Sequence, residues 1–311
     1  SLYQGTMGSS PVDVSGAAKA NGEDRLAVTV YYQDKDGFLI PVTRWIRLQQ
    51  GIARAALSLT IDSAVNREEL AYYGVYPVLP EGTGILGIDI RDGVATVDFD
   101  RHVFNYSSAA AERNIVASIV YTLTGFKTIE RVRILINGYE QGVLKFGTDI
   151  SGTAGREDIA VNADVSAKED GAYKADIFLF RQANEQFTYL VPVSVEDGES
   201  AGDLPGSLIR RLLSENTDGG LYNEMPSGAE LLEWNMNQGV LTLNFSESFT
   251  AYGGNSKEEA ILKQLAYTVG QIDGIKGLRI LVEGAAAQLP EGTDISSGLS
   301  IPVTINDVMG G

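Results

Sequence analysis

The sequence contains two copies of one pattern, and this internal repeat limits the fold more than any other feature does. Residues 92–99 (DGVATVDF) match residues 238–245 (QGVLTLNF), a shift of 146 positions. Residues 132–138 (VRILING) recur at 278–284 with the same shift, and residues 147–151 (GTDIS) recur at 292–296 with a shift of 145. Because the matched segments occur in one order in both halves, the sequence predicts a tandem duplication of one domain.

The spacing of apolar residues predicts the same elements in each copy. Each helix should carry an apolar stripe at i, i+3, i+4 and i+7, and each strand should be alternating or continuously apolar. The first copy predicts strands at 26–32, 38–45, 84–90, 94–99 and 131–136, and the second at 176–180, 189–195 and 278–282. The stripes are Ile52, Ala55, Ala56, Leu59; Leu208, Ile209, Leu212, Leu213; Ile115, Val116, Ile119, Val120, Leu123; and Ile261, Leu262, Leu265, Ala266, Val269.

These elements give the order ββαββαβ in each copy, with a loop rich in glycine and proline after the first helix. Ser256 and Glu259 have the spacing of a capping box at the start of the last helix. Short apolar segments at 159–161 and 299–305 add a further strand. We expect an α+β fold in which two helices pack on one face of a small mixed sheet.

The same patterns set the expected domain boundaries. Residues 1–25 are expected to be a disordered N-terminal segment. The first domain should span 26–165, a polar linker 166–174, and the second domain 175–311.

The composition excludes several functions. With 24 Lys and Arg against 41 Asp and Glu, the formal net charge is −17, which disfavours nucleic-acid binding because that binding needs clustered cations. The absence of cysteine removes disulfides, thiol catalysis and thiolate metal sites, and one histidine, His102, is too few for a multi-histidine metal centre. No stretch approaches the roughly 20 apolar residues that span a bilayer. We therefore expect no catalytic residues, no metal and no cofactor.

Four short motifs resemble functional sites but are better explained as turns or surface residues. Residues 82–87 fit the dinucleotide pattern G-x-G-x-x-G, but an extended segment follows where that site needs a helix. Asp98 and Asp100 are spaced like paired carboxylates, but the second copy has Asn and Ser there, so we expect a solvated hairpin face. Residues 34–37 lack the later ligands of a calcium loop and predict a turn. His102 has no serine or carboxylate pattern beside it, so we expect a structural loop residue.

One apolar segment lies outside the predicted elements. Residues 70–80 (LAYYGVYPVLP) include Tyr76, which recurs in the second copy as Tyr222, and this recurrence favours a packing role. Tyr72 and Tyr73 do not recur. Because tyrosine offers a large contact area at low entropic cost, Tyr72 and Tyr73 are the candidate partner-binding residues. Packing within the domain remains the alternative for both.

The combined motifs resemble the Germane (GerM) domain, which occurs in sporulation and spore germination proteins of endospore-forming bacteria. In the first copy the resemblance rests on residues 79–83 (LPEGT), 92–99, 119–124 (IVYTLT) and 132–138. In the second copy it is looser and rests on 238–245, 265–268 (LAYT) and 278–284. It covers nearly the whole chain after about residue 25.

The resemblance implies a non-enzymatic function, since the family offers no catalytic residues to transfer. The family is similar to the ring-building modules of secretion-system proteins, so the resemblance implies an assembly or scaffold protein that contacts other envelope or channel proteins. It implies action at the channel that joins the mother cell and the forespore, outside the cytoplasm, with a lipid anchor N-terminal to this sequence. The chain alone is expected to be a monomer that forms rings only with partners. The alternative is a cell-wall-associated module in which Tyr72 and Tyr73 bind glycan or peptide.

Overall fold

The computed structural model describes residues 24–163, 173–197, 203–215, 217 and 219–310. They divide into two compact units. Unit 1 comprises the described residues up to Asn162 together with 183–189 and 303–310, and unit 2 comprises the described residues of 163–182 and 190–302. The predicted N-terminal segment 1–25 and linker 166–174 lie outside the described residues, except for the last two positions of each.

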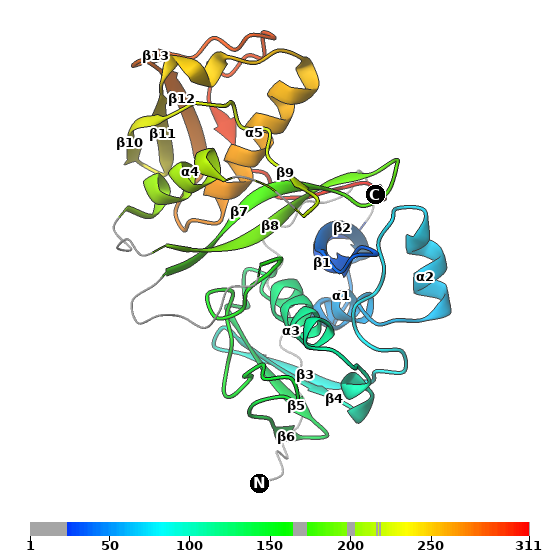
Figure 1. Cartoon of the computed structure of the whole chain (residues 1–311). Coiled ribbons are helices and arrows are strands. Elements are labelled where there is room, and N and C mark those ends of the chain that lie inside the picture. Colours follow the sequence, from blue (N-terminus) through cyan, green and yellow to red (C-terminus); the bar gives the residue numbers. More distant parts are fainter. Residues whose placement is uncertain (1–23, 164–172, 198–202, 216, 218, 311) are drawn as a thin grey trace. The chain divides into compact units, whose positions relative to one another are not determined.

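The first copy of the repeat contains the predicted elements in the predicted order, with additions. The elements are β1 (Arg25–Gln33), β2 (Leu39–Arg47), α1 (Ile52–Ser58), α2 (Ala64–Ala71), β3 (Ile85–Arg91), β4 (Val94–Phe99), the 3-10 helix η1 (Arg101–Phe104), α3 (Ala109–Leu123), β5 (Arg131–Ile136) and β6 (Tyr139–Glu140) (Figure 1). Helix α2 lies where the sequence predicted a loop. Its N-cap is Ser63, whose side chain accepts a hydrogen bond from the amide of Asn66, which satisfies a free donor of the first turn.

The second copy repeats this order without a counterpart of α2 among its described residues. Its elements are β7 (Tyr173–Gln182), β8 (Thr188–Asp197), α4 (Leu204–Ser214), β9 (Leu221–Tyr222), β10 (Leu231–Asn237), β11 (Val240–Phe245), the 3-10 helix η3 (Glu247–Thr250), α5 (Asn255–Gly270), β12 (Gly277–Val282), β13 (Ala285–Ala286) and β14 (Leu299–Ser300). The α+β class and the duplicated ββαββαβ order are therefore confirmed. The further strand is present as β14, which pairs with β12. In the first copy the predicted segment 159–161 forms no strand, and the contact that matches β14 is a single bridge between Val132 and Ala154.

The strands of each copy form two separate sheets, whereas the sequence predicted one. In the first copy, β1 and β2 pair antiparallel on their own, and β3, β4, β5 and β6 form a second sheet in that order with β4 parallel to β5. In the second copy, one sheet has the order β8-β7-β9, and the other has the order β10-β11-β12-β13 with β11 parallel to β12.

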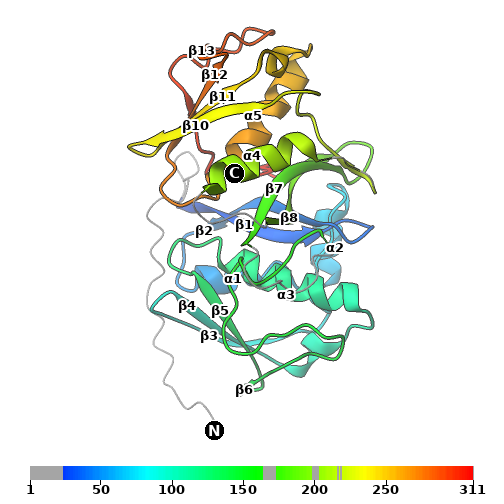
Figure 2. The same ribbon diagram turned by 60° about the vertical axis from the view of Figure 1, so that its left-hand side comes forward.

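The burial of α3 explains the two sheets of the first copy. The stripe predicted from Ile115 to Leu123 is buried, but so is every other residue of that segment. A helix that is buried all round needs cover on both sides. Figure 2 shows α3 between the β1–β2 sheet and the sheet that contains β3, β4 and β5.

Polar residues of α3 join it to β1 and recur in the second copy. The hydroxyl of Ser118 donates to the carbonyl of Tyr31 at 2.7 Å, and the amide of Tyr31 donates to the hydroxyl of Thr122 at 3.1 Å. In α5, Gln264 and Thr268 stand at the matching positions and bind the carbonyl and amide of Phe178 at 2.8 and 3.1 Å. Each long helix therefore satisfies backbone groups of the first strand of its own copy.

The hairpin turns are confirmed by their backbone angles. Asp92 and Gly93 have φ of 50° and 77°, and Gln238 and Gly239 have φ of 51° and 83°. Two successive positive φ angles are typical of the type I′ turn, whose twist matches that of the paired strands. The predicted turn at 34–37 is also confirmed, because the Asp34 carboxylate accepts hydrogen bonds from two amides of the turn.

The predicted capping box at Ser256 and Glu259 is wrong. Helix α5 begins at Asn255 with Gly254 as its N-cap and has no side-chain cap. The amide of Gly254 donates to the Glu291 carboxylate at 2.6 Å, so the loop after β13 already satisfies the group that a capping-box glutamate would bind. Glu259 instead pairs with Lys263 at 2.8 Å.

Candidate functional site

Two buried glutamates form polar sites at matching positions of the two copies. Glu112 accepts hydrogen bonds from the Tyr106 hydroxyl at 2.7 Å and from the amides of Phe146 and Thr148 at 2.9 and 3.0 Å. Both glutamate side chains are buried in the first turn of their helices. Glu112 therefore fastens the repeated GTDIS segment to the start of α3.

Glu258 repeats this arrangement in the second copy. It accepts from the Tyr252 hydroxyl at 2.9 Å and from the amides of Glu291 and Thr293 at 2.9 and 3.1 Å. The sequence reasoning missed both glutamates, although the shift of 146 that relates them also relates Tyr106 to Tyr252.

The electrostatics of both sites favour the charged carboxylate. Burial raises the pKa of Glu112, but the hydrogen bonds from Thr148, Tyr106 and Phe146 outweigh it, and the resulting pKa lies below the usual value. The pKa of Glu258 is lowered in the same way. Burial and the neighbouring carboxylate raise the pKa of Tyr106 and of Tyr252, so both hydroxyls remain donors. A glutamate that is ionised and saturated by donors has no proton to give, so these sites are structural.

The acidic hairpin around Asp98 has the same structural role in both copies. The carboxylate of Asp98 accepts a hydrogen bond from the amide of Gly138 at 2.9 Å, and the Asn244 side chain accepts from the amide of Gly284 at 2.9 Å. Because aspartate and asparagine both offer the oxygen that this turn needs, the position tolerates the loss of charge.

Asp100 binds backbone and His102 at the start of η1. Its carboxylate accepts from the amide of His102 at 3.0 Å and lies 3.1 Å from Nδ1 of the same residue. Burial raises the pKa of Asp100, but hydrogen bonds with Gly84 and His102 outweigh it and lower the pKa. The sequence predicted no carboxylate pattern that would make His102 a catalytic base. The contact is local and exposed, so it fits a helix cap better than a catalytic pair.

The glycines of residues 82–87 form a turn and a close approach. Gly82 has φ of 83°, and strand β3 follows at Ile85 where a dinucleotide site would need a helix. A Cβ on Gly84 would lie 2.6 Å from an oxygen of Asp100, so a larger residue there would displace the Asp100 side chain. Among the described residues, no group of three or more Asp, Glu and His side chains is arranged to bind a metal ion.

Tyr72 and Tyr73 lie at the end of α2 in an aromatic cluster of unit 1. Their ring centroids are 5.2 Å apart, and both rings contact Phe187, at 5.4 and 5.2 Å. Phe187 also stacks on Tyr189 at 6.0 Å. We call Tyr72, Tyr73, Phe187 and Tyr189 the aromatic cluster.

The two tyrosines differ in how they are held. Tyr72 is 63% exposed, whereas Tyr73 is half-buried. The Tyr189 hydroxyl donates to the carbonyl of Tyr73 at 2.6 Å, and the Asn184 side chain donates to the carbonyl of Tyr72 at 3.1 Å. Tyr73 is thus fixed inside the cluster and Tyr72 presents its ring to solvent. Partner binding by Tyr72 and Tyr73 stays a prediction.

Tyr76 and Tyr222 both pair through their backbone with the first strand of their own copy. Tyr76 forms an antiparallel bridge with Gln33, with hydrogen bonds of 2.7 and 3.0 Å, and Tyr222 pairs with Phe180 of β7. Tyr76 and Tyr222 are 37% and 49% exposed. Both side chains are partly covered, and the packing role predicted for them stays a prediction.

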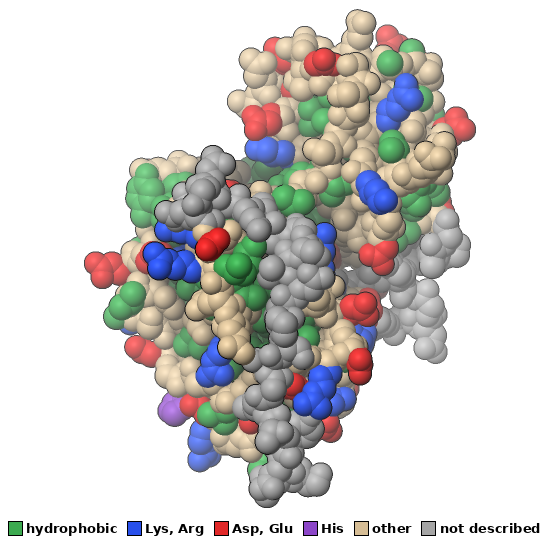
Figure 3. All heavy atoms as spheres, turned by 180° about the vertical axis from the view of Figure 1, so that it is seen from behind, with side chains coloured by type: hydrophobic (Ala, Val, Ile, Leu, Met, Phe, Trp, Pro, Cys, Tyr) green, Lys and Arg blue, Asp and Glu red, His purple; other side chains and the backbone are tan. Residues whose placement is uncertain are grey.

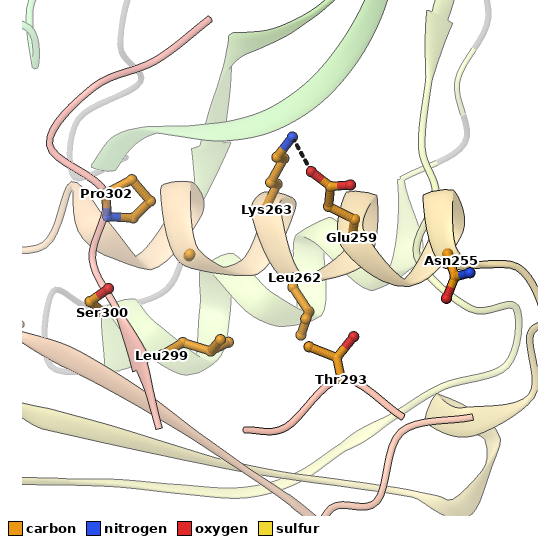
Figure 4. A pocket seen from close by; sticks show the side chains of 9 residues that line it. Asn255, Glu259, Leu262, Lys263, Thr293, Leu299, Ser300 and Pro302 are labelled. Carbon is orange, nitrogen blue, oxygen red and sulfur yellow. Dashed lines mark ion pairs between the residues drawn. The ribbon is translucent and has the colours of Figure 1, made fainter. Parts of the chain in front are cut away.

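Unit 2 contains a shallow groove beside α5, with a volume of about 370 Å³. Figure 4 shows Leu262, Leu299 and Thr293 along it and a dashed line between Glu259 and Lys263. These two are its only charged lining residues, and they neutralise each other. The groove therefore has no free charged group to orient a ligand.

The surface carries charges of both signs. Figure 3 shows Lys and Arg side chains interspersed with Asp and Glu on the described part of the face that it presents. Many arginines pair with acidic neighbours, such as Arg44 with Glu69 at 2.7 Å and Arg67 with Asp62 at 2.8 Å. Among the described residues, no helix is both long and apolar enough to cross a bilayer.

The chain matches known proteins over most of its length. The family model Germane, described as sporulation and spore germination, matches residues 29–142 and 177–288. Over 289 residues the chain is 27% identical to spore germination protein GerM of Bacillus subtilis (strain 168), covering 89% of this chain and 77% of that protein. The solved structure of the tandem GerMN domains of the sporulation protein GerM from Bacillus subtilis is similar, with a TM-score of 0.77 and 26% identity over 91% of this chain and 99% of that one.

Proposed function

The chain belongs to the Germane family of sporulation and spore germination proteins, and from this premise we propose that it is a non-enzymatic assembly protein of the sporulation envelope. It acts through protein–protein contacts with other envelope or channel proteins at the channel between mother cell and forespore. It works outside the cytoplasm, held by a lipid anchor. Alone it is a monomer, and it joins rings only with its partners.

The use of its carboxylates carries this proposal. Glu112, Glu258 and Asp98 bind backbone amides of turns and loops, so their lone pairs are engaged in holding the fold. A glycoside hydrolase needs a carboxyl group with a raised pKa that faces a second carboxylate across a cleft. The pKa of both glutamates is instead lowered. Because these carboxylates hold the fold, we infer that the two domains act through the surfaces by which they contact partners.

The exposed ring of Tyr72 is the best candidate for such a surface in unit 1. It belongs to a cluster that is fixed by Tyr73 and Phe187, so the ring is held in one position before binding. Rigid aromatic anchors of this kind are enriched among the residues that dominate binding energy. The same ring supports the alternative function, a cell-wall-associated module for glycan or peptide, because sugars and peptides also stack on exposed aromatic side chains.

A photo-crosslinking experiment distinguishes the two functions. A benzophenone amino acid replaces Tyr72 in the full chain, and the same replacement of Val65, which is 73% exposed on the same helix, serves as the control. In sporulating cells, we expect position 72 and not position 65 to capture an envelope protein. Binding of purified muropeptides by the wild-type chain, lost in Tyr72→Ala, would support the alternative. If position 72 captures nothing and muropeptides do not bind, both assignments to this residue are wrong.

A further inference from the structure

The outer edge of β2 in unit 1 is covered by side chains and backbone from elsewhere in the unit. Strand β1 pairs with one edge of β2, and the backbone groups of Leu39, Pro41 and Thr43 that bond outside this pair point to the other edge. The proline at this edge is expected, since proline has no amide to donate. We call Leu39, Pro41, Thr43 and Trp45 the outer edge of β2.

Ile305 forms the centre of the contact with this edge. The amide and the hydroxyl of Thr43 both donate to the carbonyl of Ile305, at 2.9 and 2.7 Å, and the amide of Ile305 donates back to the Thr43 hydroxyl at 2.9 Å. The side chain of Ile305 is buried, with 8% exposed. One threonine therefore binds both backbone groups of one residue, as a neighbouring strand would.

The next two residues extend the contact through their side chains. Asn306 donates from Nδ2 to the carbonyl of Pro41 at 2.7 Å, and Trp45 donates from Nε1 to the carboxylate of Asp307 at 3.0 Å. Together these contacts recognise an apolar residue, an asparagine and an acidic residue, in that order along the segment.

The end of the first repeat binds the same edge in a related way. Asn162 follows the buried Val161, and its side chain accepts from the amide of Leu39 at 2.7 Å and donates to the carbonyl of Leu39 at 2.8 Å. Both asparagines have positive φ, 55° for Asn162 and 47° for Asn306. The two repeats thus end in an apolar residue followed by a left-handed asparagine, and β2 binds both.

We propose that the outer edge of β2 is a binding site for an extended segment of the type Ile-Asn-Asp, which residues 305–307 of the same chain fill, and that residues 305–307 of a second copy can take their place. The segment is only three residues long, whereas β1 and β2 share nine residue pairs, so the segment can be released while the hairpin persists. Exchange of such a segment between identical chains links them without new contacts. The inference stands independently of the function proposed above.

Because residues 305–307 of the same chain occupy the outer edge of β2, the free protein stays monomeric. A tethered segment competes with any external one at a high effective concentration, so exchange between copies is favoured only at high protein concentration or when the tethered segment is lost. In two linked chains, residues 305–307 of one chain therefore occupy the outer edge of β2 in the other.

A peptide titration tests the site. The probe is a fluorescent synthetic peptide of residues 299–310, and the acceptor is the full chain with Ile305→Gly and Asn306→Ala, whose own segment is disabled. Because the tethered segment no longer competes, we expect this variant to bind the peptide about tenfold more tightly than the wild-type chain does. Adding Thr43→Val to the variant, or Asn306→Ala to the peptide, should abolish binding. Equal binding with and without Thr43→Val, or no binding to the disabled variant, would overturn the site.

Cysteine crosslinking in otherwise unaltered chains tests the exchange. The protein contains no native cysteine, so a short bismaleimide joins Trp45→Cys in one chain to Asp307→Cys in another only when one chain's segment lies on the other's edge. This pair leaves the contact between Thr43 and Ile305 in place. We expect a heterodimer whose yield rises with protein concentration, and a control pair of Val65→Cys with Asp307→Cys should give none. A double variant with both cysteines should close within one monomer. A heterodimer yield no greater than the control would refute exchange even if the monomer closes.

Discussion

At the scale of single residues, the fold depends on ionised carboxylates that hold backbone amides. Glu258 and Glu259 are adjacent on α5 and form a natural comparison, because Glu258 is buried among three donors and Glu259 is exposed and pairs with Lys263. In Glu258→Gln, an amide group replaces a carboxylate oxygen, so one donor of the site faces another donor.

We expect Glu258→Gln to lower the free energy of unfolding by about 1.5–3 kcal/mol, the range for hydrogen bonds to a charged group. Glu259→Gln should change it by less than about 0.5 kcal/mol, as for other exposed ion pairs. Urea denaturation followed by circular dichroism measures both. Equal effects of the two variants would show that the site around Glu258 adds nothing to stability.

The lowered pKa values of Glu112 and Glu258 predict how stability depends on pH. A carboxyl group with a lower pKa in the folded chain stabilises it above its unfolded pKa, which is about 4.3 for glutamate. That contribution is lost as pH falls through the folded pKa. We expect these groups to leave the urea midpoint constant between pH 5 and 7. Below about pH 4 the midpoint should fall. The double variant Glu112→Gln, Glu258→Gln should have a weaker fall, and an unchanged profile would contradict the assignment.

The aromatic cluster predicts different roles for its two neighbouring tyrosines. Tyr73→Ala removes a half-buried ring that contacts Tyr72 and Phe187, and we expect a loss of about 1–3 kcal/mol in the free energy of unfolding. Tyr72→Ala should cost less than Tyr73→Ala, because its ring is largely in solvent, while it should abolish capture of the partner. Thermal unfolding of both variants measures this, and a larger loss from Tyr72→Ala would reverse the roles.

At the scale of elements, the sequence predicts what local periodicity determines. The stripe on α3 and the turn at Asp92 and Gly93 are local signals, and both are confirmed. No local signal predicts the second sheet. An apolar stripe shows that one side of a helix is buried and says nothing about the other side. Small and polar residues such as Ala117 and Ser118 are buried by the β1–β2 hairpin, which only tertiary structure can determine.

The buried hydroxyls of α3 give a prediction for this second contact. Thr122→Val keeps the shape of the side chain but removes the acceptor that the amide of Tyr31 uses. We expect a loss of about 1–3 kcal/mol, the cost of a buried donor that loses its partner. Thr96→Val on the sheet, where the side chain is half-buried, should have a small effect. Hydrogen exchange at the Tyr31 amide should accelerate in Thr122→Val, and unchanged protection would show that another acceptor suffices.

At the scale of the whole molecule, the repeat predicts the duplication, the class and the family, because each follows from matched positions along the chain. The candidate surfaces could not be predicted in the same way. The aromatic cluster joins Tyr73 to Phe187, and the outer edge of β2 joins Thr43 to Ile305, residues that are far apart in sequence and outside the repeated motifs. A repeat reveals what the two copies share, whereas these contacts join positions that the repeat does not match.

The net charge of −17 gives a prediction for association of whole chains. Two copies with this charge repel each other, and the repulsion extends over a Debye length of about 10 Å at 0.1 M salt but only about 3 Å at 1 M. We therefore expect a monomer in sedimentation velocity at low salt and a larger fraction of linked copies at 1 M salt and high protein concentration. A basic partner should show the opposite dependence, because its association rate falls as salt screens the attraction. If high salt slows exchange of residues 305–307 between copies, repulsion is not what keeps the chains apart, and the barrier lies in releasing the segment from Thr43.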